Sequence, residues 1–498
     1  MQPAVKKVVI VGGGTAGWMA AALLKKVLLT AVDVELVESE EIGIVGVGEA
    51  TIPPIQIFNQ YMGFDEREFL RDTHATIKLA IKFENWRVPG DSYFHTFGAP
   101  GAQLGFTSFQ HYWHKAKQLG LAQSLWDFDL NYLCCQQEAF NIIKTPNPLY
   151  EVPYAYHFDA TLYGRFLRKI AEQQGVVRTE GMISQVTQHA ITGDVESLWL
   201  RDGRQVRGDL FIDCSGIRGL LIKQALNVPY EDWSHYLPAN SALAVPSERH
   251  ETTKPYTRSI AHHAGWQWRI PLTHRNGNGI VYNSEFLSDD EAASILVNNL
   301  DTKALADPRK ISFTTGRTTE QWHKNVVAVG LSSGFLEPLE STSIHLIQSA
   351  IVRLLKVFPH QGIDASLQQF YNQDSKTEFE TIRDFIILHY HVNERHGDKF
   401  WDHMRHIQVP ERLAQKIALF RDNGHVFNDH NDIFRDASWI QVMLGQGIVP
   451  RDHHPCVNAI PDAVLLQTLA QVQQAKQQPL TQMLAHDEFI RRYTAASS

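Results

Sequence analysis

The N-terminal part of the chain changes from a strand-like to a helix-like pattern of apolar positions and back. Residues 7–11 (KVVIV) are β-rich, residues 16–27 are rich in helix formers, and residues 32–38 (VDVELVE) again favour a strand. Between the first strand and the helix, residues 12–17 read GGGTAG, a G-x-G-x-x-G turn. The pattern predicts a strand–turn–helix–strand unit of the kind that holds a dinucleotide.

Glycines suit this turn because the chain must bend sharply, let a pyrophosphate touch the backbone and pack the helix on the strand. The N-terminus of the helix then presents N–H groups to the phosphates. Glu38 ends the second strand 21 residues after Gly17, where a ribose hydroxyl needs an acceptor. A glycine-rich turn without a ligand is the alternative, and the position of Glu38 argues against it.

The turn alone does not separate NAD from FAD, since both cofactors use it. Residues 209–216 (DLFIDCSG) and 325–330 (NVVAVG) are short apolar segments that run into small residues. They resemble the second and third flavin-contacting strands of the glutathione-reductase-type FAD fold. The sequence has no second G-x-G-x-x-G, so we expect FAD to be reduced by another protein or by a hydride donor bound without its own Rossmann domain.

Residues 76–83 (TIKLAIKF) alternate polar with apolar positions, which is the period of a β-strand. Lys78 and Lys82 share one face of this predicted strand, and the apolar residues share the other. From the pattern alone, both lysines are expected to be solvated side chains of an edge strand.

A helix is predicted to begin near residues 341–343. Pro338 holds Glu337 in an extended conformation, and apolar residues at 344, 347, 351, 354 and 355 then follow at helical spacing. The N–H groups of the first turn, with the Thr342 hydroxyl beside them, form an anion site suited to a halide. A plain Ser/Thr cap explains the hydroxyl residues equally well but gives Glu340 no role.

Trp266 and Trp268 are two residues apart on a predicted strand and therefore point to the same side. From burial habits alone, paired tryptophans belong to a core more often than to the wall of a site.

Composition narrows the class of protein. The 498 residues are 44% hydrophobic and 20% charged, which is typical of a globular protein, and the net charge of −8 without a basic block argues against nucleic acid and anionic lipid as partners. Four cysteines, two of them adjacent, form no disulfide framework and indicate a reducing, cytoplasmic compartment. Residues 8–24 carry no charge, but three consecutive glycines interrupt them, so no membrane span is predicted.

Histidines are frequent after residue 380, where His389, His391 and His396 invite a metal-binding interpretation. They form no H-E-x-x-H pattern and have no accompanying cysteines, so ordinary core or surface histidines are expected and no metal site is predicted.

Four segments together resemble the flavin-dependent tryptophan halogenase family. They are residues 12–17, the region of Lys78, residues 266–271 (WQWRIP) and residues 335–344 (FLEPLESTSI); residues 438–447 (SWIQVMLGQG) are similar to the C-terminal region of the family. W-x-W-x-I-P is the most diagnostic of these, because related aromatic hydroxylases share the FAD turn but not this hexapeptide.

The resemblance implies an α/β fold in which a glutathione-reductase-type Rossmann domain with mixed β-sheets precedes a smaller helical subdomain. Residues 1–380 are expected to form the FAD-binding halogenase domain, including the substrate-facing sheet. Residues 381–498 are expected to form a mainly helical subdomain that covers the substrate site.

The resemblance also implies roles for individual residues. Lys78 and Glu340 are the catalytic residues, and Trp266 and Trp268 form a barrier between flavin and substrate. A glycine usually stands in the family where this chain has Ser343, so both chloride and bromide stay open. The expected FAD-binding residues are Gly12, Gly14, Thr15, Ala16, Gly17, Glu38, Glu49, Val186, Leu331 and Ile344; the halide-binding residues are Thr342 and Ser343; the substrate-binding residues are Ile81, His95, Phe97 and Trp439.

The implied reaction uses reduced FAD (FADH2) from a separate flavin reductase, oxygen and a halide. Hypohalous acid diffuses to Lys78, where the amine hydrogen-bonds it or becomes a haloamine, and Glu340 assists attack on an aromatic ring. The sequence lacks a match to the tyrosine pair and the acid that hold free tryptophan in the tryptophan halogenases of this family. We therefore expect indole or a larger indole derivative, with a phenol or pyrrole behind it, and leave a homodimer open.

Two other classes stay in view. An FAD-dependent aromatic monooxygenase would put oxygen rather than halogen into the product. A non-enzymatic flavoprotein would have no use for Lys78, Glu340 and the tryptophan pair.

Overall fold

The computed structural model describes residues 4–42, 48–359, 361–429 and 432–495. It divides into two compact units. Unit 1 contains the described residues of Met1–Ala75, Phe158–Ser241 and Ile311–Glu380, and unit 2 those of Thr76–His157, Ala242–Lys310 and Thr381–Ser498.

The division into residues 1–380 and 381–498 stays a prediction. By contacts, two earlier segments, Thr76–His157 and Ala242–Lys310, group with the residues after 380. The reason is strand pairing between distant parts of the chain, which no local pattern reports: residues 80–84 pair in parallel with residues 256–260.

A six-stranded sheet forms the centre of unit 1. β1 lies between β13 and β2 and runs parallel to both, β2 pairs in parallel with β9, and β13 pairs in parallel with β22. The predicted strands at the N-terminus and at both small-residue segments are confirmed. In sheet order, the strands are β21 (Trp322–His323), β22 (Val326–Ala328), β13 (Leu210–Asp213), β1 (Lys7–Val11), β2 (Asp33–Glu38) and β9 (Val177–Glu180).

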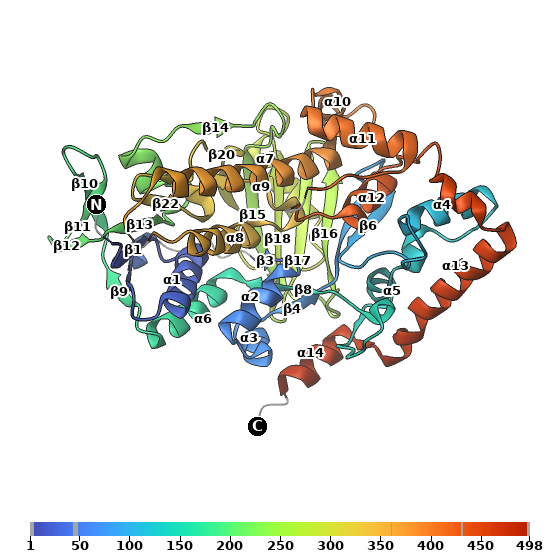
Figure 1. Cartoon of the computed structure of the whole chain (residues 1–498), viewed down its shortest axis with the longest axis horizontal. Helices are drawn as coiled ribbons and strands as arrows, with labels where there is room; N and C mark the ends of the chain where they lie inside the picture. The colour runs from blue at the N-terminus through green and yellow to red at the C-terminus, as the bar shows by residue number, and fades with distance from the viewer. Residues whose placement is uncertain (1–3, 43–47, 360, 430–431, 496–498) are drawn as a thin grey trace. The chain divides into compact units, whose positions relative to one another are not determined.

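Helix α1 (Thr15–Leu28) contacts β1 and β2, and it packs against α6 (Ala160–Gln173) and α8 (Ser343–Lys356), as Figure 1 shows. Its apolar face is buried, as the helix-forming run predicted. Unit 1 also contains the helices α2 (Pro54–Met62) and α3 (Glu66–Asp72) and two small sheets. One sheet consists of β10 (Ile183–Gln188), β11 (Val195–Leu200) and β12 (Gln205–Arg207), and the other of β14 (Tyr230–Asp232), β20 (Gly316–Thr318) and β23 (Gly334–Phe335).

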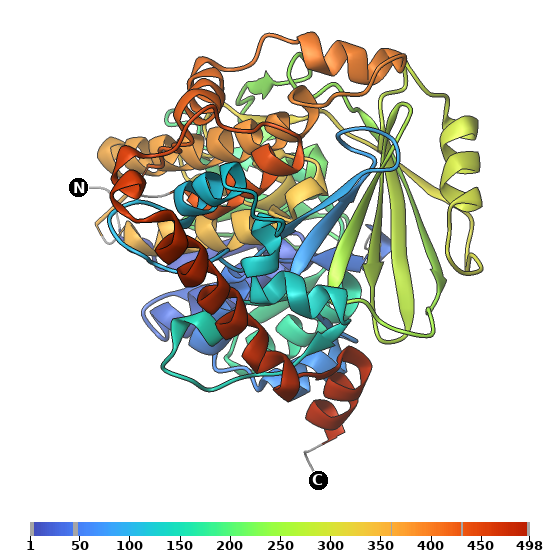
Figure 2. The same ribbon diagram turned by 90° about the vertical axis from the view of Figure 1, so that its right-hand side faces the viewer.

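Unit 2 is built on a seven-stranded sheet, whose long strands are seen in Figure 2. Helix α12 (Asp436–Gly445) packs against the edge strand β6. In sheet order, the strands are β19 (Arg309–Ser312), β15 (Ser241–Glu248), β18 (Arg275–Tyr282), β17 (Gly265–Pro271), β16 (Tyr256–His262), β5 (Ala80–Glu84) and β6 (Ser92–Thr96).

The described part of residues 381–498 is helical, with the two-residue strand β24 (Leu484–Ala485) as its only strand. Its helices are the end of α9 (Ala365–His391), then α10 (Lys399–His406), α11 (Glu411–Asn423), α12, α13 (Asp462–Gln477) and α14 (His486–Ala495). The α/β class with mixed sheets and C-terminal helices is thus confirmed. None of the helices described is both long and apolar enough to cross a membrane.

The segment around Lys78 corrects one prediction. Two strands, β4 (Thr76–Lys78) and β5, replace the single strand expected, with Leu79 between them. β4 pairs with β8 (Ala155–Asp159), whereas β5 joins the large sheet, so the two lysines belong to different sheets. Lys78 has an exposed fraction of 0%, whereas the Lys82 side chain is 28% exposed and lies 3.9 Å from Glu84. The prediction that Lys78 is solvated is therefore wrong, because Lys78 is buried in the strand that pairs with β8.

Candidate functional site

The glycine turn between β1 and α1 has the geometry of a phosphate cradle. Gly12 has φ of +111°, and a Cβ on Gly17 would lie 1.9 Å from the Gly12 carbonyl oxygen, so only glycine fits either position. At Gly14, by contrast, no described atom beyond its chain neighbours would lie within 4 Å of a Cβ. The N-cap residue of α1 is Gly14, which has no side chain with which to cap the first turn. The N–H groups of this turn and the space beside Gly14 are the features that a pyrophosphate site requires.

Glu38 lies beside this turn, where the ribose acceptor was expected. A Cβ on Gly13 would lie 1.4 Å from Glu38 Oε2, so the carboxylate rests directly on the turn. Its Oε1 accepts a hydrogen bond from Arg178 Nε at 2.6 Å. Arg178 fixes the carboxylate in place.

The start of α1 also meets the segments expected to contact flavin. A Cβ on Gly330 would lie 2.9 Å from the Ala16 Cβ and 3.6 Å from Ile347 Cγ1. Leu331 follows in a short 3-10 turn and is 42% exposed, while Ile344 is buried in the first turn of α8. Unit 1 thus brings Ala16, Leu331 and α8 together.

Two further residues expected at the cofactor lie elsewhere in unit 1. Val186, on β10, packs against the core cluster that contains Val9 and Phe211. Glu49 lies on the short strand β3 (Gly48–Ala50), and burial raises the pKa of its carboxyl to about 7, although part of the residue reaches the surface.

If the open space at Gly14 holds the cofactor pyrophosphate, a methyl group there should block the cofactor without disturbing the fold. Gly14 has φ of −75°, which alanine adopts readily. We expect Gly14→Ala to melt at the same temperature as the parent when FAD is absent, and to bind FAD about tenfold or more weakly, measured by flavin fluorescence.

Gly164→Ala is the matched control, because Gly164 on α6 also has open space around its Cα among the described atoms. Equal FAD affinity in the parent and in Gly14→Ala would contradict the assignment of the turn.

The turn before α8 holds the acid and hydroxyl residues singled out in the sequence. Glu337 is extended (φ −57°, ψ 149°) and α8 begins at Ser343, as predicted. Glu340 is 1% exposed and ends a 3-10 turn, and Ser341 has φ of +59°, a strained conformation for a residue other than glycine. The Thr342 side chain makes no capping hydrogen bond to the described first turn of α8. This argues against the plain-cap interpretation, and Ser343 and Ile344 carry first-turn N–H groups suited to an anion.

Helix α8 is fixed by a buried carboxylate on α9. Glu378 accepts hydrogen bonds from His345 at 3.0 Å, from Ser349 at 2.8 Å and from Arg353 at 2.7 Å. Burial alone would raise the pKa of Glu378, but the hydrogen bonds and charges of His345 and Arg353 lower it to about 2. The ionised carboxylate therefore holds the first turns of α8 in place.

Lys78 is held by a chain of hydrogen bonds around its neighbour Thr76. The Thr76 hydroxyl donates to the Pro271 carbonyl at 2.7 Å, so it can only accept from His157 Nδ1 at 3.0 Å. The other ring nitrogen, Nε2, must then accept from the Thr257 hydroxyl at 2.9 Å. Burial, and then the charge of Lys78, lower the pKa of His157 well below its ordinary value. A neutral His157 thus fixes β4 without adding a second buried cation beside Lys78.

A second buried histidine holds the other side of β4. His486 Nε2 accepts the Ile77 N–H at 3.1 Å, and its Nδ1 donates to the Thr253 carbonyl at 2.7 Å. Burial lowers the pKa of His486 to about 4. Residues from three distant parts of the chain therefore hold the strand that carries Lys78.

Neutral His486 predicts a loss of stability in mild acid. Its pKa falls from 6.5 in the unfolded chain to about 4 in the fold, so the unfolded state takes up a proton first as the pH drops below 6.5. The stabilisation is complete above pH 6.5 and is lost progressively towards pH 4, amounting to about 3 kcal/mol. The amide of His486→Gln can keep both hydrogen bonds but does not titrate. Between pH 6.5 and pH 4, the free energy of unfolding measured in urea should therefore fall by about 3 kcal/mol less in this variant than in the parent. The exposed His263→Gln is the control, and an unchanged pH profile in His486→Gln would contradict the prediction.

Aromatic side chains gather around the residues expected to bind the substrate. Ile81 and His95 are cross-strand partners on β5 and β6. The His95 ring lies 5.5 Å from Phe385, whose ring is 4.8 Å from Trp439. The structure therefore brings Ile81, His95 and Trp439 into one buried region.

Sequence patterns did not identify three residues of this region. Phe385 stacks on Phe434 at 4.0 Å, and the ammonium of Lys416 lies 3.8 Å from the centre of the Trp439 ring. Only Trp439 stands within a segment that resembled the family. The other three carry no local signal, because their proximity arises from the packing of α9, α11 and the segment before α12.

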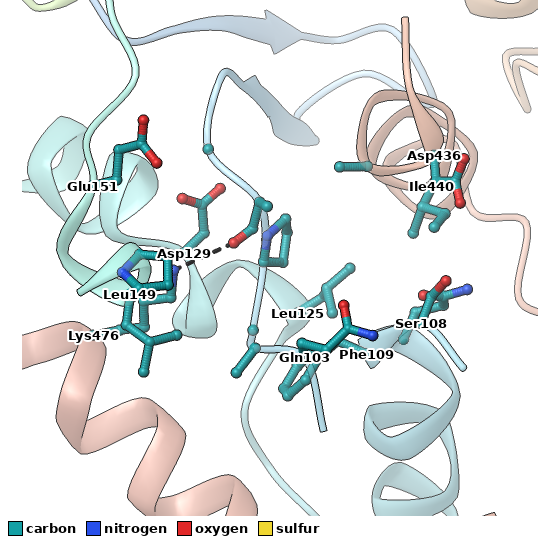
Figure 3. Close-up of a pocket in the computed structure, with 18 of the residues that line it drawn as sticks. Gln103, Ser108, Phe109, Leu125, Asp129, Leu149, Glu151, Asp436, Ile440 and Lys476 are labelled. Carbon is teal, nitrogen blue, oxygen red and sulfur yellow. Dashed lines mark hydrogen bonds between the residues drawn. The ribbon is translucent and has the colours of Figure 1, made fainter. Parts of the chain in front are cut away.

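Phe97 contacts Lys78 and lines a cavity. The Phe97 ring centre lies 5.2 Å from the Lys78 ammonium nitrogen, close enough for a cation–π contact. Phe97 also lines a cavity of about 490 Å³, shown in Figure 3. The volume is that of a small-molecule site, and Lys78 contacts Phe97, one of the residues that line it.

Trp266 and Trp268 lie on β17, two residues apart, as predicted. Their rings are 6.1 Å apart, and their exposed fractions are 1% and 8%. A Cβ on Gly279 would lie 2.0 Å from Trp268, so the facing strand uses glycine to make room for the indole.

The structure offers little to a metal ion. In the described ranges, no three His, Cys, Asp or Glu side chains are grouped to hold one. His389 is buried, with its Nδ1 2.8 Å from the Phe385 carbonyl and its ring 4.7 Å from Phe83.

Comparisons with known proteins agree over nearly the whole chain. A family model for tryptophan halogenases matches residues 7–462. The tryptophan 6-halogenase ThaL of Streptomyces albogriseolus is 36% identical over 504 residues, covering 93% of each chain. Among solved structures, Xcc4156, a flavin-dependent halogenase from Xanthomonas campestris, is 48% identical with a TM-score of 0.96, covering 98% of each chain. BrvH, a flavin-dependent halogenase from Brevundimonas sp. BAL3, is 41% identical with a TM-score of 0.95, covering 98% of this chain and 100% of BrvH.

Proposed function

Since this chain belongs to the tryptophan halogenase family and is a flavin-dependent halogenase, we propose that it transfers chloride or bromide to an indole-type ring through Lys78. The observation that carries the proposal is the complete burial of Lys78 with its ammonium beside Phe97, a residue that lines a cavity of small-molecule size. Burying a lysine is costly, and a protein retains such a residue where its chemistry is used.

FAD is the cofactor that the family implies, and the glycine turn supports its placement. Gly12, Gly14 and Gly17, with the N–H groups of Thr15 and Ala16, would hold the pyrophosphate, and Glu38 the ribose. Leu331 and Ile344 would border the ring system, while Val186 and Glu49 would lie further out. When bound and reduced, FAD supplies the reducing power that activates oxygen for oxidation of the halide. A separate flavin reductase would deliver it as FADH2.

The turn of residues 340–343 supports a halide site. Thr342 and Ser343 would hold chloride or bromide at the N-terminus of α8, where N–H groups and the helix dipole favour an anion. Ser343 adds a hydroxyl donor where the family usually has glycine, so bromide and chloride should both be tested.

Lys78 would fix the electrophilic halogen. Its amine would hydrogen-bond hypohalous acid or accept the halogen as a haloamine, close to a ring that stacks on Phe97. Ile81, His95 and Trp439 would form further walls, and Trp266 and Trp268 would keep the ring from reaching the flavin directly. Glu340 would stabilise the cationic ring intermediate or accept its proton.

Product analysis tests the proposal. The protein is incubated with FAD, a flavin reductase, NADH and either bromide or chloride, together with a panel of indoles that includes free tryptophan. The products are identified by mass spectrometry. We expect a halogenated indole that requires halide, and indole to be turned over faster than tryptophan. An oxygenated product formed equally well without halide would instead indicate an aromatic monooxygenase.

A further inference from the structure

We propose that the cavity beyond Phe97 binds a positively charged appendage of the substrate, such as an alkylammonium chain on the indole. This inference rests on the proposed function, because it assumes that the ring being halogenated stacks on Phe97 near Lys78. It adds to the proposed function a charged group that the substrate bears at a distance from that ring.

The cavity has more room than a bare indole needs. Its volume of about 490 Å³ lies within the range of about 300–1,000 Å³ that is usual for small-molecule sites. Part of the lining is apolar and suits the methylene groups of a chain attached to the ring. The large apolar side chains of this lining are Phe97, Phe106, Phe109, Leu125, Leu149 and Ile440.

Acidic residues outnumber basic residues in the lining of the cavity. Asp129, Glu151 and Asp436 contribute three carboxylates, whereas Lys476 is the only cation among the described lining residues. Figure 3 shows Glu151 and Asp436 on opposite sides of the cavity. Both reach solvent, so both are accessible to a ligand.

Two of the four charged groups are both buried and hydrogen-bonded within the protein. Asp129 is 1% exposed and accepts the Asn131 N–H at 2.9 Å and the Thr96 hydroxyl. Lys476 is 5% exposed and donates to the Ala99 carbonyl at 3.4 Å.

The charge of the residues that line the cavity stays negative in either state of Asp129; Lys78 contacts Phe97 but is not itself a lining residue. Burial raises the pKa of Asp129 and lowers that of Lys476, while the charges of Asp129 and Glu151 favour the protonated lysine. If Asp129 is neutral, Glu151 and Asp436 still outnumber Lys476. An ammonium group is therefore attracted into the cavity and a carboxylate is repelled.

The test uses three ligands with the same ring, an indole bearing a 2-aminoethyl, a 2-hydroxyethyl or a 2-carboxyethyl chain at C3. Their kcat/KM values are compared in the bromination assay, and their affinities are measured by calorimetry without turnover. We expect the amine to exceed the alcohol by about tenfold and the carboxylate to be the poorest, as two partly exposed ion pairs would give.

Charge-removing variants locate the effect. Glu151→Gln and Asp436→Asn should each lower the amine-to-alcohol ratio by about three- to fivefold, and the double variant should bring it close to one. Asp436 accepts a hydrogen bond from Asn428 and begins α12, so its replacement can disturb folding. Glu151 is exposed, so if Asp436→Asn does not fold, the ratio measured in Glu151→Gln decides the test. Glu411→Gln, an exposed change on α11, should leave the ratio unaltered.

An equal or greater preference for the carboxylate, or an amine preference that survives in the double variant, would overturn the inference. Failure of the proposed function looks different. In that case no ligand is halogenated, but calorimetry still shows the amine bound more tightly than the alcohol.

Discussion

Replacing Lys78 by methionine is expected to lower the rate of halogenation by about 10³-fold or more, because the electrophilic halogen is no longer fixed beside the ring. Methionine keeps the length of the side chain and removes a charge that is fully buried. The variant should therefore fold, because the new side chain fills the same space. Initial rates of halogenated product, together with thermal unfolding, measure both effects.

Lys82→Met is the matched control. Lys82 lies four residues further along the same segment, but its side chain is 28% exposed and close to Glu84, so its loss should change the rate less than about twofold. NADH consumption and hypohalous acid release, detected with a small halogen acceptor in solution, should persist in Lys78→Met. A normal halogenation rate in Lys78→Met, or an equal loss in Lys82→Met, would remove Lys78 from the proposed role.

The second large effect is expected at Glu340. Glu340→Gln preserves the shape of a side chain that is 1% exposed but removes its negative charge, so the cationic ring intermediate loses its stabilising base. We expect kcat to fall by about 10²-fold or more, with the affinity for FAD and the melting temperature little changed. Single-turnover product formation and flavin fluorescence report these quantities.

Glu337 offers a comparison with the same burial. It also is 1% exposed and lies three residues before Glu340, on the other side of Pro338. Glu337→Gln should retain most of the activity if the role of Glu340 is chemical. If both variants lose activity and stability together, the two acids are better explained as structural residues of the turn.

Local sequence determined those parts of the protein that depend on neighbouring residues. The glycine turn at Gly12–Gly17 follows from sterics within a few positions, and the start of α8 at Ser343 follows from Pro338 and the helical spacing of apolar residues. The orientation of Trp266 and Trp268 likewise needs only the two-residue period of a strand. These features were predicted because each is fixed by the backbone within a turn or two.

Tertiary structure alone decided the environment of Lys78. The alternating pattern of residues 76–83 predicted a solvated lysine, but β4 pairs with β8 and is held by His157 and His486, which are distant in the sequence. The cavity beyond Phe97 likewise combines walls from α12 and α13 with the segment after β6. Burial is a property of what packs against a residue, and periodicity reports only which side of its own element a residue occupies. The sequence by itself therefore determined the elements and their chemistry, whereas only the packing of distant segments decided which charged groups are shielded from water.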